Sequence, residues 1–259
     1  MSEVSGPNWS RDELIVAFNL YCKIPFTKIN ANNKAVKKLA PVIGRSTSSV
    51  ALKLANFARL DPALRKRNIS GMSHGSKMEA EIWNEFNDDW EELAYQSELV
   101  LAKLRNDSVE NSAGIASVDL PREGKERDAL VKTRVNQSFF RQTVLASYDS
   151  RCCITGISIP ELLVASHIIP WAIDKKNRMN PCNGLCLNAL HDKAFDKGLI
   201  TITADYRLKV SEVLRKRGAV AEPFFMPYDH QRIALSQRFL PSREFFEYHN
   251  KNIFRDSLD

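Results

Sequence analysis

The spacing of apolar residues predicts helices through the first hundred positions of the chain. In residues 11–22, Leu14, Phe18 and Tyr21 recur at intervals of four and three, which places them on one face of a helix. Ser10 precedes this segment and is followed three residues later by a glutamate, the pattern of a capping box. We therefore expect an amphipathic helix that begins just after Ser10.

Three further helices are expected before residue 106. Gly44 separates the first two, Asp61-Pro62 ends the second, and the third is long and acidic. Their predicted ranges are 35–44, 48–60 and 77–105. Residues 106–124 contain many Ser, Asn and Gly and few large apolar side chains, a composition that is typical of a linker.

The second half of the chain mixes helical and strand-like patterns. The expected elements are a helix over 138–149, strands over 152–157 and 162–168, a hairpin over 199–211 and a terminal helix over 242–254. The predicted fold class is therefore α+β. We expect an all-helical domain over 1–105, a linker over 106–135 and a second domain over 136–259.

Basic residues are concentrated in one part of the helical domain. The formal net charge is +6, yet residues 34–78 hold ten Lys or Arg against a single acid, Asp61. Residues 79–102 hold eight acids and no Lys or Arg. A basic block of this size suits a polyanion partner such as nucleic acid. The alternative is a solvated face that the neighbouring acidic block balances.

The composition also bears on location. No apolar run approaches the roughly 20 residues of a membrane span, and the first residues lack the pattern of a signal peptide. We therefore expect a cytoplasmic protein with no membrane partner. Its five cysteines are odd in number and are expected to be reduced there.

One stretch, Ser166–Asp196, carries candidate chemistry. His167 follows a short apolar run, an Asn-Gly pair begins 16 residues later at Asn183, and His191 lies eight residues beyond it. A histidine has a pKa of about 6.5, so it can take a proton from water at neutral pH. A divalent cation can neutralise a phosphate and its leaving oxygen. A strand–loop–strand–helix unit would bring these groups together, with the Asn-Gly pair tightening the loop.

Residues 136–254 resemble the HNH endonucleases of the ββα-metal class, particularly the restriction-enzyme branch. The matching stretches are FFRQTVLASYDSRCCITGI, SHIIPW, NPCNGLCLNALHDKAFDKGLITI and PSREFFEYHNKNIF. The resemblance implies that His167 is the general base and that Asn183 holds the loop that orients it. It also implies that His191 lies on the metal side, where Asp196 could join it on Mg²⁺ or Mn²⁺.

Two features depart from that family. Many HNH nucleases place an Asp or His directly before the base, whereas this chain has Ser166, a poor metal ligand. Many relatives also hold a structural zinc with two CxxC pairs, and this chain has no CxxC. We therefore expect no structural zinc, and we expect Cys153, Cys182 and Cys186 to be small core residues.

The segment LAPVIGRSTSSVALKLANF is compatible with a helix-turn-helix element that contacts double-stranded DNA. Arg45 and Lys53 are expected to meet phosphates, and the hydroxyls of Ser46, Ser48 and Ser49 to bond the backbone or bases. The alternative is a helical hairpin whose apolar residues are simply core. Both can hold at once, because a recognition helix also needs a buried face.

A second candidate contact is the loop NISGMSHGSKM, where His74 and Lys77 could close on a phosphate; the alternative is an ordinary surface loop. The N-terminal part also resembles the sulfur-binding domains that recognise phosphorothioated DNA, through YCKIPF, IGRSTSSVALKLANFARLDP and GMSHGSK. That resemblance implies an apolar pocket ringed by cationic groups. Pro25 and Phe26 would be its wall, and Arg45 and His74 its rim.

These features predict a modification-dependent restriction endonuclease of the type IV kind, active in defence and directed to phosphorothioated duplex DNA. With one catalytic motif per chain, a double-strand cut requires a homodimer or two nicking events. One alternative is a homing or mobile-element nuclease that reads unmodified sequence. Another is a DNA-binding regulator whose HNH domain is inactive.

Overall fold

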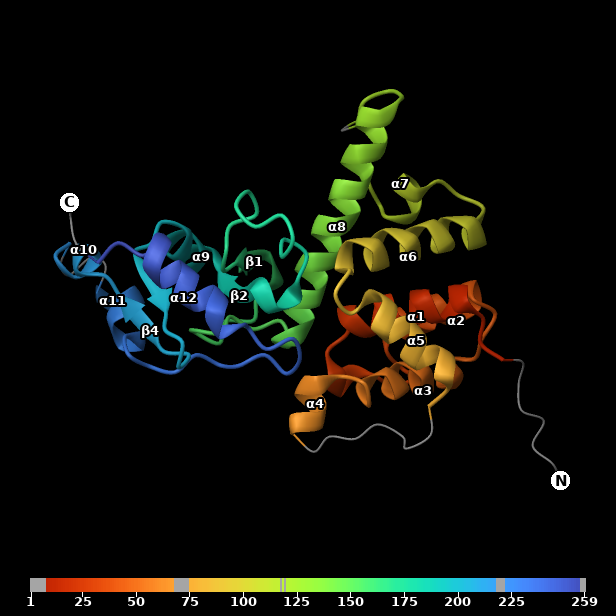
Figure 1. The fold of residues 1–259 in the computed structure, drawn as a ribbon, viewed down its shortest axis with the longest axis horizontal. Helices are drawn as coiled ribbons and strands as arrows, with labels where there is room; N and C mark the ends of the chain where they lie inside the picture. The colour runs from red at the N-terminus through yellow and green to blue at the C-terminus, as the bar shows by residue number, and fades with distance from the viewer. Residues whose placement is uncertain (1–7, 68–74, 117, 119, 218–221, 257–259) are drawn as a thin grey trace. The chain divides into compact units, whose positions relative to one another are not determined.

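The structure is a computed structural model that describes residues 8–67, 75–116, 118, 120–217 and 222–256. The chain forms two units, Met1–Phe139 and Phe140–Asp259 (Figure 1). Within the described residues, the first unit is helical and the second contains two small antiparallel sheets among helices. The predicted α+β class is confirmed. No described helix is both long and apolar enough to span a membrane.

The helical unit is built around aromatic residues of its first helix. Ser10 and Glu13 form the predicted capping box at the start of α1. Phe18 of α1 stacks on Phe57 with ring centroids 4.9 Å apart and lies 5.0 Å from Trp83. Such pairs add to the free energy of area burial. The helices are α1 Arg11–Lys23, α2 Lys34–Val42, α3 Thr47–Ala58, α4 Pro62–Lys66, α5 Lys77–Phe86, α6 Trp90–Arg105 and α7 Val109–Ser112.

The predicted helix over 77–105 is wrong in one respect, because it is two helices. The side chain of Asp89 accepts the backbone N–H of Glu92 at 3.1 Å and so caps the start of α6. Asp61 likewise caps α4, which the sequence did not predict. Side-chain oxygens that satisfy free N–H groups make these helix starts favourable. The apolar spacing alone does not reveal them.

The predicted linker over 106–135 is also partly helical. It contains α7, and the long helix α8 Lys125–Ser147 begins inside it and continues across the boundary between the two units. The stretch KERDALVKTRV lacks Gly and Pro and is rich in residues with good helix propensity, so it can extend the helix at little cost.

The second unit contains the predicted strand–loop–strand–helix. β1 Leu163–His167 pairs antiparallel with β2 Gly184–Asn188, and His167 lies opposite Gly184. The helix α9 Ala189–Asp196 follows β2 directly and packs against both strands. A β-carbon on Gly184 would lie only 2.4 Å from a methyl group of Val144, so glycine lets α8 approach β2 closely.

The rest of this unit surrounds the ββα element. The predicted hairpin is confirmed as β3 Ile200–Ile202 and β4 Leu208–Val210, and the predicted terminal helix as α12 Arg243–Asn252. Two short helices, α10 Glu212–Arg215 and α11 Glu222–Phe225, lie between them in sequence. The strand predicted over 152–157 is wrong. That segment is a turn, with Gly156 in the left-handed region and the N–H of Cys152 bonded to the carbonyl of Ile157 at 2.8 Å.

Candidate functional site

His167 ends β1 and is held on three sides. Its ring stacks on Phe140 with centroids 4.0 Å apart and meets the edge of Trp171 at 5.6 Å. Its Nε2 lies 2.8 Å from the carbonyl oxygen of Arg178. Burial lowers the pKa of His167, while that carbonyl and the negative charge of Asp192 act in the opposite direction. The sequence did not single out Phe140 or the Arg178 carbonyl.

Asn183 is fully buried and holds the loop that follows β1. Its Oδ1 accepts the N–H of Ile169 at 2.8 Å, and its Nδ2 donates to the carbonyls of Ile169 and Asn177 at 3.1 and 3.2 Å. Asn177 precedes the residue whose carbonyl faces His167. Asn183 therefore fixes both ends of the loop segment that orients the histidine ring.

His191 lies on α9, and its ring is packed into the unit. Its Nδ1 is 3.0 Å from Oδ1 of the N-cap residue Asn188, which also accepts the backbone N–H of His191. The ring meets Phe225 and Tyr228 edge-on, with centroids 5.2 and 5.7 Å away. Burial lowers the pKa of His191, and the nearby Phe224 carbonyl opposes this. Its Nε2 is buried, and it has no hydrogen-bond partner among the residues that the structure describes.

Asp192 and Asp196 lie one turn apart, on a different face of α9 from His191. Asp192 is half-buried, and it makes no hydrogen bond or ion pair within the described residues. Loss of solvent around its carboxylate raises the pKa of Asp196, and the charge of Asp192 raises it further. The charge of Asp192 also raises the pKa of His167, so it acts on both Asp196 and His167.

The donor set can be tested for a divalent metal. His191 and Asp196, the predicted metal pair, are five residues apart and so point about 140° away from each other around the helix. Within the described residues, no three His, Cys, Asp or Glu side chains are grouped so that they could hold a metal ion. Mg²⁺ is usually held by one or two carboxylates together with water and substrate phosphates. The described side chains of the motif therefore do not form a complete metal site by themselves.

The cysteines near the motif are thiols. Cys153 and Cys186 are buried, and Cys182 is half-buried. Burial raises the pKa of Cys153 well above its ordinary value and that of Cys186 to about 12, so neither is a thiolate at neutral pH.

Residues 152–203 match a family model described as HNH endonuclease. The match contains His167, Asn183 and His191 as well as both strands and the helix of the ββα element. No curated protein matches the chain. The second unit thus carries an HNH endonuclease domain, which supports a nuclease that acts on DNA.

Three of the predicted DNA contacts, Arg45, Ser49 and Lys53, line a cavity of about 480 Å³ together with Trp9. The cationic groups of Arg45 and Lys53 lie 5.2 and 5.1 Å from the centroid of the Trp9 ring. Acids meet both cations: Glu13 accepts two bonds from Arg45, at 2.7 and 2.9 Å, and the buried Glu79 pairs with Lys53. The structure therefore brings Arg45, Ser49 and Lys53 together, and it pairs each of the two cations with a glutamate.

The other predicted contacts of this unit have local roles. Ser46 caps α3, and its hydroxyl accepts the N–H of Ser49 at 3.1 Å. Ser48 is exposed on the first turn of α3. Lys77 is exposed at the start of α5 and lies 3.6 Å from Glu81.

The residues predicted to form the wall of a sulfur pocket do not line the cavity at Arg45. These residues, Pro25 and Phe26, are half-buried at the short 3₁₀ turn Phe26–Lys28. Trp9 and Met78 supply the apolar surface of the cavity instead. His74, the other predicted rim residue, lies outside the described residues.

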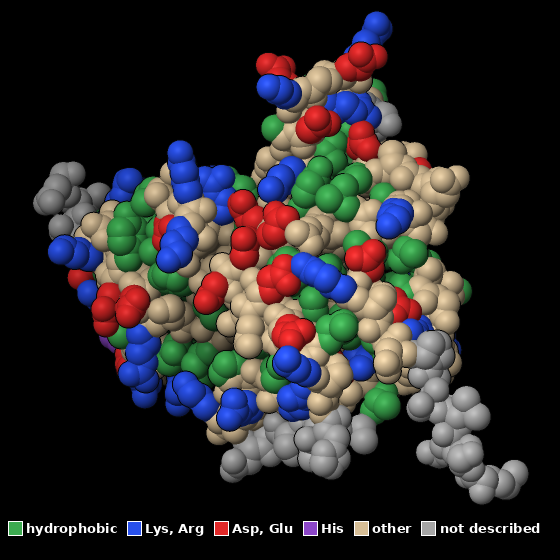
Figure 2. All heavy atoms as spheres, turned by 45° about the vertical axis from the view of Figure 1, so that its right-hand side comes forward, with side chains coloured by type: hydrophobic (Ala, Val, Ile, Leu, Met, Phe, Trp, Pro, Cys, Tyr) green, Lys and Arg blue, Asp and Glu red, His purple; other side chains and the backbone are tan. Residues whose placement is uncertain are grey.

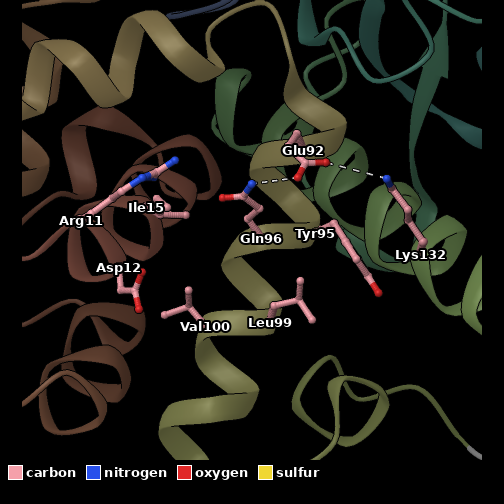
Figure 3. Close-up of a pocket in the computed structure, with 9 residues that line it drawn as sticks. All are labelled: Arg11, Asp12, Ile15, Glu92, Tyr95, Gln96, Leu99, Val100 and Lys132. Carbon is pink, nitrogen blue, oxygen red and sulfur yellow. Dashed lines mark hydrogen bonds and ion pairs between the residues drawn. The ribbon is translucent and has the colours of Figure 1, made fainter.

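A further cavity of about 500 Å³ lies beside α1 and α6 (Figure 3). Glu92 accepts a hydrogen bond from Gln96 at 2.8 Å and lies 3.8 Å from Nζ of Lys132. On the face drawn in Figure 2, Lys and Arg side chains are interspersed with Asp and Glu. Two cations of the basic block, Lys53 and Lys77, pair with Glu79 and Glu81 of the acidic block.

Proposed function

We propose that this protein is a metal-dependent DNA endonuclease with His167 as its general base. The contact between Nε2 of His167 and the carbonyl of Arg178 carries the proposal. A carbonyl oxygen only accepts hydrogen bonds, so Nε2 carries the hydrogen and Nδ1 of the neutral ring keeps its lone pair. The lowered pKa of His167 favours this neutral form at pH 7. Nδ1 can then take a proton from an attacking water.

The surrounding residues hold this base in one orientation. Phe140 fixes the plane of the imidazole ring, and Asn183 fixes the loop that presents the Arg178 carbonyl. A catalytic group that is already oriented loses little entropy in the reaction. Carboxylates of α9 would hold a cation such as Mg²⁺ or Mn²⁺, which when bound neutralises the scissile phosphate and the leaving oxygen.

For the target, we propose modification-dependent restriction of phosphorothioated duplex DNA, read by the helical unit. Sulfur in place of a non-bridging oxygen is larger and less well hydrated, so it favours apolar surface near cations. The cavity formed by Trp9, Met78, Arg45 and Lys53 combines both features. The apolar and cationic lining of this cavity supports the proposal.

Cleavage of matched plain, methylated and phosphorothioated duplexes in Mg²⁺ or Mn²⁺ tests both parts. We expect wild type and His230→Asn, a change at an exposed histidine outside the motif, to cut phosphorothioated DNA, and His167→Ala to cut none. Equal cutting of plain DNA would contradict modification dependence and favour a nuclease that reads ordinary sequence. Binding without cutting under every condition would contradict the endonuclease and favour a regulator.

A further inference from the structure

A basic loop over residues 168–183 connects the two strands of the motif. Its cations are Lys175, Lys176 and Arg178, and the one acid in its sequence is Asp174. The Asp174 carboxylate accepts the backbone N–H groups of Lys176 and Asn177 at 3.0 and 3.1 Å and the side-chain amide of Asn177 at 2.7 Å. Asp174 therefore holds the backbone of the loop, and the loop presents a net positive charge beside the candidate base.

Arg178 contacts the site through both its backbone and its side chain. Its carbonyl oxygen lies 2.8 Å from Nε2 of His167. Its guanidinium carbon lies 4.9 Å from the centroid of the Trp171 ring, and that ring meets the ring of His167 edge-on at 5.6 Å. Trp171 thus contacts both the base and the guanidinium. Stacking on an aromatic face restricts the planar guanidinium, so the group is pre-organised for a ligand.

The guanidinium of Arg178 has donors that the protein leaves unused. Arg178 is half-buried, and its side chain makes no ion pair within the described residues. Its Nε is buried and has no hydrogen-bond partner there. A buried donor without a partner is unfavourable, and a guanidinium matches two oxygens of a phosphate with two parallel N–H bonds. This arrangement indicates an anionic ligand next to the base.

We infer that the guanidinium of Arg178 binds the phosphate that the water activated by His167 attacks. The inference rests on the proposed endonuclease function and adds a substrate-binding residue to it. Negative charge builds up on the phosphate oxygens in the transition state, and a fixed cation stabilises that charge. Arg178 then supplies the carbonyl that orients the base and the cation that holds the substrate, so the loop places the two groups relative to each other.

Two measurements on the full chain test this assignment. Binding of a phosphorothioated duplex is followed by fluorescence anisotropy in EDTA over a range of KCl concentrations, and cleavage of the same duplex by saturating enzyme is followed in Mn²⁺ in a single turnover. We expect Arg178→Gln to lower the slope of log affinity against log salt by about 1. We expect it to slow cleavage by about 100-fold or more. Arg178→Lys keeps the charge without the planar fork, so it should keep the salt slope and recover part of the rate.

Arg243→Gln is the matched control. Arg243 is exposed at the start of α12, and its guanidinium carbon lies 5.7 Å from the centroid of the Tyr206 ring. The control therefore removes the same charge and the same kind of ring contact outside the motif, and it should leave the salt slope and the rate unchanged. The pH midpoint of cleavage should also stay at its wild-type value in Arg178→Gln, because the backbone carbonyl that faces His167 remains. A shifted midpoint with a wild-type salt slope would mean that Arg178 only positions the base, which would overturn the assignment.

The outcomes separate the assignment from the function. A wild-type rate and salt slope in an Arg178→Gln variant that unfolds cooperatively on heating would overturn the role of Arg178, while wild-type cleavage still supports the endonuclease. No cleavage of any duplex by wild type would overturn both. If Arg178→Gln does not fold, the unaltered protein decides the question, because bound DNA should protect Arg178, and not Arg243, from modification by phenylglyoxal. Equal modification of Arg178 with and without DNA, measured by mass spectrometry, would overturn the assignment.

Discussion

Replacing Asn183 by Asp tests how the loop orients the base. The two side chains have nearly the same shape, so packing is preserved. Aspartate can still accept the N–H of Ile169, but it cannot donate to the carbonyls of Ile169 and Asn177. The variant therefore removes one buried and one partly buried hydrogen bond and leaves their acceptors in place.

The expected cost follows from those contacts. A buried polar group left without its partner costs about 1–3 kcal/mol, so two carbonyls give about 2–6 kcal/mol. A charged carboxylate facing two carbonyl oxygens is also repelled, which adds to the loss. Because the loop presents the carbonyl that orients His167, we expect cleavage to fall by at least about tenfold, equivalent to about 1.4 kcal/mol in the barrier.

Urea unfolding measures the free energy of unfolding of the variant. The hydrogen-exchange rate of the Ile169 amide, which donates to Asn183, reports how firmly the loop is held. The matched control is Asn252→Asp, an exposed amide on α12 that donates to the Tyr248 carbonyl at 2.8 Å and should leave stability and cleavage unchanged. A variant at Asn183 with wild-type stability and wild-type exchange would refute the role assigned to these hydrogen bonds. Lost cleavage with both quantities unchanged would point to direct contact with substrate.

Two further predictions concern the cores of the units. Burial lowers the pKa of His249 to about 4 from an ordinary value near 6.5, so the unfolded chain binds this proton first, and stability should fall by up to about 3 kcal/mol as pH drops from 6.5 to 4. A His249→Asn variant whose urea midpoint has the same pH dependence as wild type would contradict this. Glu79 is fully buried against Lys53 and Arg59, so Glu79→Ala should cost about 3–5 kcal/mol in thermal unfolding, whereas the exposed Glu81→Ala should cost almost nothing. Equal unfolding temperatures for these two variants would show that the buried charges are not coupled.

The sequence predicts most of the elements because their signals are local. A capping box and an alternating hairpin each lie within a few residues, and both appear in the structure at the expected places. The Asn-Gly pair does not form the predicted turn, because Asn183 ends a 3₁₀ turn and Gly184 is extended at the start of β2. The wrong predictions occur where one local residue pattern is compatible with two different structures. The sequence predicts Asp61 only as a helix end, but it also caps the next helix, and the strand predicted over 152–157 bends at Gly156.

The candidate site shows the limit of spacing as a guide to side-chain direction. Adjacent residues on a helix point about 100° apart, so the sequence alone does not tell which way the side chains of His191 and Asp192 point. The start of α9 is set by Asn188, whose side chain bonds both the backbone and the ring of His191 three residues later. An Asn three residues before His191 is visible in the sequence and was a signal for this cap. The order His, Asn, His identifies the motif, whereas the contacts of His191 with Asn188 and Phe225 are seen only in the structure.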